Sequence, residues 1–281
     1  MRRHLLFFKF VSVAIAVSCF SKPSHATDDG SRYAAIWEKT TGPAFVARHG
    51  MTSQVYQQEF NNWTAQGYCL TLVSGYSVGN QARYAAIWEQ KSCPAYVARH
   101  GLTSAAYQKE FDTLVGQQGY RLKWVSGYNV AGQDFYAAIW EKTSGPAFVA
   151  RHGMTSQAYQ QEFDKWTGQG YCLTLVSGYS VGNQDRYAAI WEQKSCPAYV
   201  ARHGLTSQGY QQEFNNWTTQ GYRLKLVSGH KIGGKQSYAA IWEKTPGPEF
   251  VARHGMTSDG YQQEFDKWVN QGFRLTLVNG Y

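Results

Sequence analysis

One short motif that could carry chemistry occurs five times in this chain. Arg48-His49-Gly50 and its four counterparts place a guanidinium next to an imidazole, just before a threonine. Histidine can act as a nucleophile, and arginine can bind a phosphate or carboxylate through two parallel hydrogen bonds. The motif therefore indicates either phosphoryl transfer or anion binding. The five pairs are Arg48 and His49, Arg99 and His100, Arg151 and His152, Arg202 and His203, and Arg253 and His254.

Five equal copies argue against catalysis by this motif. It resembles the motif of histidine phosphatases, but such an enzyme gathers a second histidine and further arginines around one phosphate. After residue 26, the one histidine outside the repeated motif is His230. Ser228-Gly-His-Lys231 matches the S-x-x-K of serine hydrolases, yet it ends a strand pattern rather than opening a helix. We expect no catalytic residue, no cofactor and no metal, and keep a hydrolase or phosphatase as the third alternative.

The motif also has a structural interpretation, which we favour. Arg48 can pair with Glu38 or Glu59, and His49 can hold the turn between a strand and a helix. The alternative is contact with an anion or a sugar, because free amides at a helix N-terminus attract anions.

The tryptophans fall into two sets. Those at a strand position beside tyrosine could expose part of a ring to a sugar, whereas those at the helix position of Trp63 are expected in the core. The strand tryptophans are Trp37, Trp88, Trp140, Trp191 and Trp242.

The elements that must position these residues repeat along the whole chain. Copies begin at Tyr33, Tyr84, Tyr136, Tyr187 and Tyr238, with steps of 51, 52, 51 and 51 residues. A fixed period of this length predicts units that bury their cores against their neighbours. We therefore expect one repeat domain over 27–281. Its copies span 33–83, 84–135, 136–186, 187–237 and 238–281.

Each copy predicts three strands and one helix, an α+β repeat. In the first copy, alternation predicts strands over 33–39, 44–49 and 68–76. Thr52 is a typical helix N-cap, and Gly67 is a typical helix end. We expect an antiparallel three-stranded meander plus one helix per unit, arranged as a curved solenoid or half-barrel. The alternative is a closed five-fold propeller-like ring, in which the first and last strands would pair.

The cysteines predict links between copies. After residue 26 there are four, and the two intervals of 24 residues fall at the same repeat positions. At two other junctions, the same positions hold arginine and glycine. Cysteine thus occurs at both positions or at neither. We predict the disulfides Cys69–Cys93 and Cys172–Cys196, each worth about 3 kcal/mol in the chain-entropy model.

The N-terminus predicts export. A basic start, an apolar run from Leu5 to Phe20 and Ser24-His25-Ala26 together indicate a signal peptide over 1–26. A lipoprotein anchored through Cys19 is the less favoured alternative. Removing these residues lowers the formal charge from +8 to +4, so charge gives little reason to expect nucleic-acid binding. We expect a secreted or periplasmic protein with no membrane span.

The repeat also resembles a known family. Tyr-Ala-Ala-Ile-Trp-Glu, Gly-Pro-Ala-Phe-Val-Ala-Arg-His-Gly, Tyr-Gln-Gln-Glu-Phe and Val-Ser-Gly-Tyr are similar to bacterial tandem repeats found beside β-lactamase-like serine hydrolases. Similar repeats form the N-terminal domain of fungal polyglycine hydrolases. The resemblance implies an extracellular accessory or recognition module, and no catalytic residue carries over. We expect a lectin-like, multivalent module that binds a glycan, cell wall or host protein, or alternatively an accessory module for a separate serine hydrolase.

Overall fold

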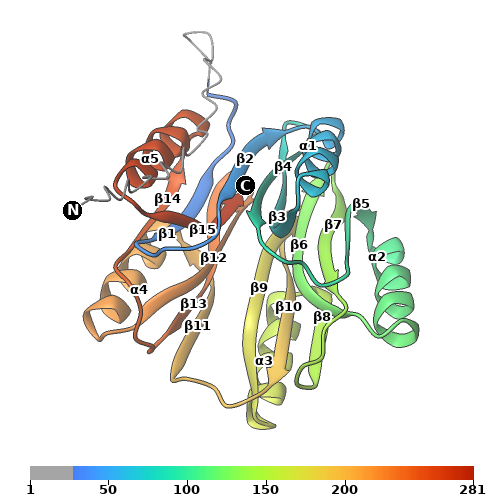
Figure 1. Ribbon diagram of the computed structural model, residues 1–281. Helices are drawn as coiled ribbons and strands as arrows, with labels where there is room; N and C mark the ends of the chain where they lie inside the picture. The colour runs from blue at the N-terminus through green and yellow to red at the C-terminus, as the bar shows by residue number, and fades with distance from the viewer. Residues whose placement is uncertain (1–27) are drawn as a thin grey trace, which may run out of the picture.

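The computed structural model describes residues 28–281, so the expected signal peptide lies outside the described residues. Within them, fifteen strands form five separate three-stranded antiparallel sheets, and each sheet carries one α-helix. Figure 1 shows the helices on the outside of the molecule and the sheets within. The predicted unit of three antiparallel strands and one helix is therefore confirmed.

The elements fall into four classes that recur in every unit. The outer strands are β2 (Phe45–Met51), β5 (Tyr96–Thr103), β8 (Phe148–Met154), β11 (Tyr199–Thr206) and β14 (Phe250–Met256). The helices are α1 (Ser53–Ala65), α2 (Ser104–Phe111), α3 (Ser156–Gly168), α4 (Ser207–Thr219) and α5 (Ser258–Asn270). The inner strands are β3 (Tyr68–Val78), β6 (Arg121–Val130), β9 (Tyr171–Val181), β12 (Arg223–Ile232) and β15 (Arg274–Gly280). The middle strands are β1 (Tyr33–Glu38), β4 (Gln81–Gln90), β7 (Gln133–Glu141), β10 (Gln184–Gln193) and β13 (Lys235–Glu243).

Local sequence signals set the helix boundaries. Thr52 caps α1, because its hydroxyl accepts a hydrogen bond from the amide of Val55 at 3.3 Å. Just past the helix, Gly67 adopts φ +79°, a left-handed conformation that suits glycine. The second copy has one extra residue, and the π-helix η1 (Asp112–Gln117) follows α2 there. A π-turn holds one more residue per turn than an α-turn, so it accommodates the insertion.

Each sheet combines strands from two consecutive copies. In the first sheet, β4 lies between β2 and β3 and is antiparallel to both. A meander would keep β4 next to β5, but β5 pairs with β7 in the following sheet. The connectivity therefore differs from the expected meander, because the helix carries the chain past the middle position, which the next copy then fills. We call each set of outer strand, helix, inner strand and middle strand a blade, numbered 1 to 5 from β2.

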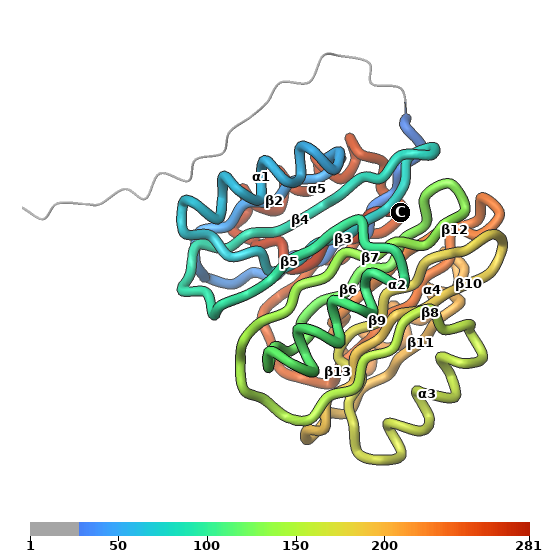
Figure 2. The backbone as a smooth tube through the Cα atoms, turned by 90° about the vertical axis from the view of Figure 1, so that its right-hand side faces the viewer, coloured from blue at the N-terminus to red at the C-terminus, as the bar shows by residue number. Residues whose placement is uncertain are grey.

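The N-terminal strand completes blade 5 and closes the ring. β1 lies between β14 and β15 and is antiparallel to both, as Figure 1 also shows. Arg32 and Tyr281 extend this pairing through two backbone hydrogen bonds of 2.7 and 2.8 Å. Consecutive inner strands contact one another around the axis, and β15 contacts β3. Of the two arrangements considered, the structure therefore has the closed ring, and Figure 2 shows its first and last blades side by side.

A belt of Ser-Gly-Tyr segments joins the inner strands. Ser126 accepts a hydrogen bond from the amide of Gly75 at 3.1 Å, and a Cβ on Gly75 would meet the Tyr128 ring at 2.4 Å. Only glycine lets this ring approach so closely. The same bond recurs at the other four junctions, and the last returns to the first copy. These bonds run from Gly127 to Ser177, Gly178 to Ser228, Gly229 to Asn279 and Gly280 to Ser74.

Two junctions between blades are linked by disulfides. Cys69–Cys93 and Cys172–Cys196 form as predicted, with Cα separations of 5.7 and 5.6 Å. They join blade 1 to the loop that enters blade 2, and blade 3 to the loop that enters blade 4. Disulfides are typical of an oxidising environment, either extracellular or periplasmic.

The other three junctions use an arginine at the cysteine position. Arg121 donates to the Pro146 carbonyl, pairs with Glu192 of the next blade at 3.3 Å, and lies 4.7 Å from the centre of the Phe148 ring. Arg223 and Arg274 make the same three kinds of contact, and Arg274 spans the closing junction. We call this arrangement the arginine staple.

The middle strands form the centre of the core. Their Tyr-Ala-Ala-Ile-Trp segments are at most 2% exposed in every copy. In blade 1, the buried Tyr56 of α1 packs on two of these residues, Tyr84 and Trp88, at ring-centre distances of 5.1 and 6.2 Å. Among residues 28–281, no helix has the length and apolar character needed to cross a membrane.

Candidate functional site

The five motif arginines lie on the outer strands, at the edge of each sheet. Arg48 pairs with Glu59 of the following helix at 3.2 Å and donates to the Ala47 carbonyl at 3.0 Å. The same Arg–Glu pair spans 3.1 to 3.7 Å across the five copies. Of the two expected partners, Glu59 is therefore the one used, whereas Glu38 pairs with Arg223. The guanidinium also covers a carbonyl on an edge strand, which blunts that edge.

The five histidines bridge neighbouring copies. His100 Nε2 lies 2.9 Å from the hydroxyl of Ser53, the first residue of the preceding helix, and its ring stands edge-on to Tyr56 at 4.7 Å. Each of the others contacts the equivalent serine, and His49 completes the circle on Ser258 at 3.2 Å. Burial lowers the pKa of four of them and so favours the neutral imidazole. These four are His100, His152, His203 and His254.

The burial of the two sets of tryptophans is the reverse of what the sequence predicts. Trp37 and its four counterparts are 0% exposed, so they offer no ring face to a sugar, and the expectation of an exposed face is wrong. They lie on middle strands, which have a neighbour on each side and a helix above. Trp63 on α1 is instead partly exposed. Its indole donates to Glu59 at 2.7 Å, and the Arg48 guanidinium lies 5.5 Å from its ring centre.

A groove brings the arginine and histidine positions together between blades 3 and 4. Its volume is about 230 Å³, and it separates α3 from the outer strand β11 of the next blade. The apolar part of its wall is largely aromatic, whereas its polar groups come from both blades. The lining residues are Tyr159, Gln160 and Phe163 from α3, and Ala201, Arg202 and His203 from β11. We call this the junction groove.

The contacts that frame the junction groove recur at every junction. The helix tyrosine and the next histidine are 4.7 to 4.8 Å apart in all five. The helix phenylalanine and the aromatic residue that starts the next outer strand are 6.2 to 6.4 Å apart. The arginine, the histidine and the aromatic contacts beside them thus recur in the same arrangement at all five junctions.

Sequence reasoning missed the glutamine. Gln160 lies between Tyr159 and Phe163, is exposed, and lines the groove. Its signal was available, because residues three apart share a helix face and Phe163 follows Gln160 by three. The equivalent residues are Gln57, Gln108, Gln211 and Gln262.

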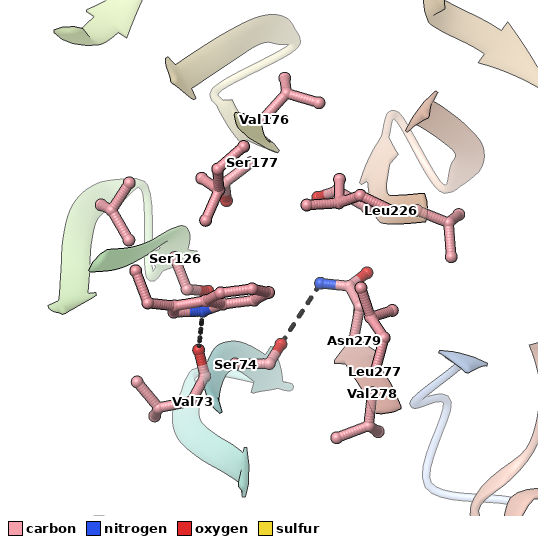
Figure 3. A pocket seen from close by; sticks show the side chains of 14 residues that line it. Val73, Ser74, Ser126, Val176, Ser177, Leu226, Leu277, Val278 and Asn279 are labelled. Atoms are coloured by element: carbon pink, nitrogen blue, oxygen red, sulfur yellow. Dashed lines mark hydrogen bonds between the residues drawn. The ribbon is translucent and has the colours of Figure 1, made fainter. Parts of the chain in front are cut away.

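The ring axis is filled by side chains. Trp124 lines the small cavity at the centre, where its indole donates to the Val73 carbonyl at 2.7 Å, and Figure 3 shows the side chains around this cavity. Nearby, the Asn279 amide donates to Ser74 at 3.3 Å. The central cavity has a volume of about 20 Å³, which leaves room for roughly one water molecule. The axis is therefore not a site for a larger ligand.

The other motif residues have separate structural partners. Ser228 is buried and accepts the amide of Gly178, whereas Lys231 donates to the Gly30 carbonyl. His230 replaces the tyrosine of the Ser-Gly-Tyr belt and contacts Asp185 at 2.5 Å. These contacts assign Ser228 and Lys231 to different neighbours rather than to each other.

The family comparison agrees with the blade boundaries. A family model described as a polyglycine hydrolase-like structural repeat matches residues 24–40, 42–91, 94–143, 145–194, 197–245 and 247–281. The four complete matches each span one blade, from outer strand to middle strand. The first and last matches are partial, and together they supply the strands and helix of blade 5. Six matches cover nearly all of the described residues, and the chain therefore belongs to the family of polyglycine hydrolase-like structural repeats.

Proposed function

We propose that this protein is a secreted, non-catalytic module that binds a polymeric extracellular ligand, such as a glycan, a cell-wall polymer or a host protein, at its five junction grooves. The observation that carries this proposal is the groove between blades 3 and 4, together with the recurrence of its framing aromatic contacts at all five junctions. Five equal sites suit a ligand that is itself repetitive. The structural family to which the chain belongs is compatible with a non-catalytic role.

The chemistry of the groove supports weak contacts with a neutral or mildly polar segment. The partly exposed Phe163 supplies apolar surface above the buried Tyr159. The exposed Gln160 amide donates one N–H to Asp164 at 2.8 Å and keeps a second N–H and its carbonyl oxygen for a ligand. The arginine is already paired with a glutamate, so a strong charge is not needed in the ligand. Several such contacts along one chain can raise affinity by roughly 10²- to 10⁴-fold over a single contact.

Binding of one saccharide at two lengths tests this proposal. An array of oligosaccharides and long polysaccharides should show retention of the long form and little retention of the matching short form. Replacing the five groove glutamines by alanine one after another should then weaken binding in steps. Gln161→Ala is the matched control, because Gln161 is also exposed on α3 but is outside the groove lining. Equal loss from Gln160→Ala and Gln161→Ala would argue against the grooves.

The family description also favours a second candidate, an accessory module that acts with a serine hydrolase on another chain. In that case, the ring would bind the hydrolase rather than its substrate. Co-purification with a hydrolase, together with no retention on any polymer, would support this candidate and contradict the first.

A further inference from the structure

One end of the ring carries the whole net charge of the described residues. We define the cationic rim as the end where inner strands begin and middle strands finish, together with the loops between blades. Ten lysines and arginines and six glutamates lie there, whereas the rest of residues 28–281 holds thirteen cationic and thirteen acidic side chains. The opposite end and the outer wall of helices are therefore close to neutral.

Every copy contributes one exposed lysine to the rim, just after its middle strand. Some are matched locally, since Lys91 pairs with Glu89 at 2.7 Å. Others rest on aromatic rings, since Lys142 lies 5.7 Å from the centre of the Tyr120 ring. The five lysines are Lys39, Lys91, Lys142, Lys194 and Lys244.

Two further lysines bring unmatched charge close to the axis. Lys123 and Lys225 lie on the inner strands β6 and β12, are exposed, and form no ion pair with any residue in 28–281. Lys123 is near Glu192, which already pairs with Arg121 and Lys194. Burial raises the pKa of Glu192, but the hydrogen bond from Lys194 and the nearby cations outweigh it and lower the pKa. Cations thus outnumber the carboxylate at this junction.

We propose that the cationic rim binds an acidic polysaccharide, a chain of sugars that carry carboxylate or phosphate groups. A ring of lysines can follow a flexible polyanion at several points, and each contact releases counterions. Nucleic acid is disfavoured because single strands need open aromatic faces for stacking. At the rim, lysines cover the faces of Tyr120, Tyr222 and Phe273. The rim is a different surface from the junction grooves and does not depend on them.

Salt-dependent binding to polygalacturonate tests this proposal, with neutral dextran and single-stranded DNA as comparison ligands. We expect the wild type to bind polygalacturonate and not dextran. Lys123→Gln with Lys225→Gln should weaken binding about tenfold at 50 mM salt and lower the slope of log affinity against log salt by roughly one to two. The control is Arg83→Gln with Lys235→Gln, which removes the same charge at the opposite end of the ring. It should change the affinity less than twofold.

Each contrary result has a defined meaning. Equal losses in the two double variants would show non-specific attraction and overturn the proposal. DNA binding as tight as polygalacturonate binding, lost in the same rim variant, would overturn it in favour of nucleic acid. Replacing all five groove glutamines should leave polygalacturonate binding unchanged. The proposal for the rim and the proposal for the grooves can therefore be contradicted independently of each other. Matching unfolding curves for the variants exclude misfolding.

Discussion

At the residue scale, the Arg-His-Gly motif joins neighbouring elements. The arginine fixes its own helix through a glutamate, and the histidine reaches the helix of the preceding copy. Sequence spacing placed both residues beside a helix N-terminus, but it could not show that the serine partner comes from another copy. The burial of the strand tryptophans was also not predictable from one copy. It depends on which strand lies in the middle of the sheet, and that strand comes from the next copy.

The Ser-Gly-Tyr belt leads to a prediction about glycine. A Cβ on Gly127 would meet the Tyr179 ring at 2.5 Å, and this ring is held by hydrogen bonds to Tyr136 and Gly153. Gly127→Ala should therefore lower the free energy of unfolding by about 1–3 kcal/mol through overpacking. Urea unfolding measures this. Gly116→Ala is the control, because nothing outside its own stretch of helix lies within 4 Å of the added Cβ, and it should be neutral or stabilising. Equal effects would contradict the account of the belt.

The junction histidines predict a loss of stability in acid. Burial lowers the folded pKa of His152 below its ordinary 6.5, so the unfolded chain binds the proton more tightly. The stabilisation is complete above pH 6.5 and is lost as the pH falls through the lower folded pKa. The free energy of unfolding should therefore decrease from pH 7.5 to pH 5. His152→Gln should make this decrease shallower, and an unchanged slope would show that the histidine does not contribute.

At the scale of elements, strands, helices and caps followed from the sequence because their signals are local. The alternation of side chains along each strand, the threonine caps and the left-handed glycines are each determined by residues within one copy. The order of strands in the sheet did not follow, because β4 could pair on either side and periodicity does not select the partner. The disulfides were predicted because cysteine occurs at both of two repeat positions or at neither of them. The same comparison singled out Arg121 at one of these positions but did not reveal its contacts.

The arginine staple should be transferable between junctions. Cys69→Ser with Cys93→Ser should cost about 3 kcal/mol of the free energy of unfolding. Cys69→Arg, Cys93→Gly and Tyr96→Phe together reproduce the residues of the staple, and should recover about 1 kcal/mol through the ion pair and the cation–π contact. Thermal and urea unfolding would measure the recovery.

The matched control keeps a side chain where the staple needs glycine. In the native staple, a Cβ on Gly145 would lie 2.9 Å from the Arg121 guanidinium. Cys69→Arg and Tyr96→Phe with Cys93→Ser should therefore recover less than the full set. If the full set is no more stable than the double serine variant, the staple does not replace the disulfide.

At the scale of the molecule, closure of the ring makes the five junctions equivalent. The aromatic contacts of the fifth junction, the fifth histidine contact and the fifth Ser-Gly bond all depend on β1 entering blade 5. The sequence indicated that closure was possible, because the chain starts with a middle strand and finishes with an inner one. It could not select closure over an open array, since the curvature per repeat depends on how neighbouring blades pack.

A designed disulfide across the closing junction tests this claim most directly. Gly42 and Arg274 occupy the positions that Cys93 and Cys69 hold at the first junction, and a Cβ on Gly42 would lie 2.9 Å from the Arg274 guanidinium that the substitution removes. We predict that Gly42→Cys with Arg274→Cys forms this bond within one chain. Non-reducing mass spectrometry would then show a linked peptide containing positions 42 and 274 in the monomer. Free thiols at both positions, or a bond found only between two chains, would contradict the closed ring.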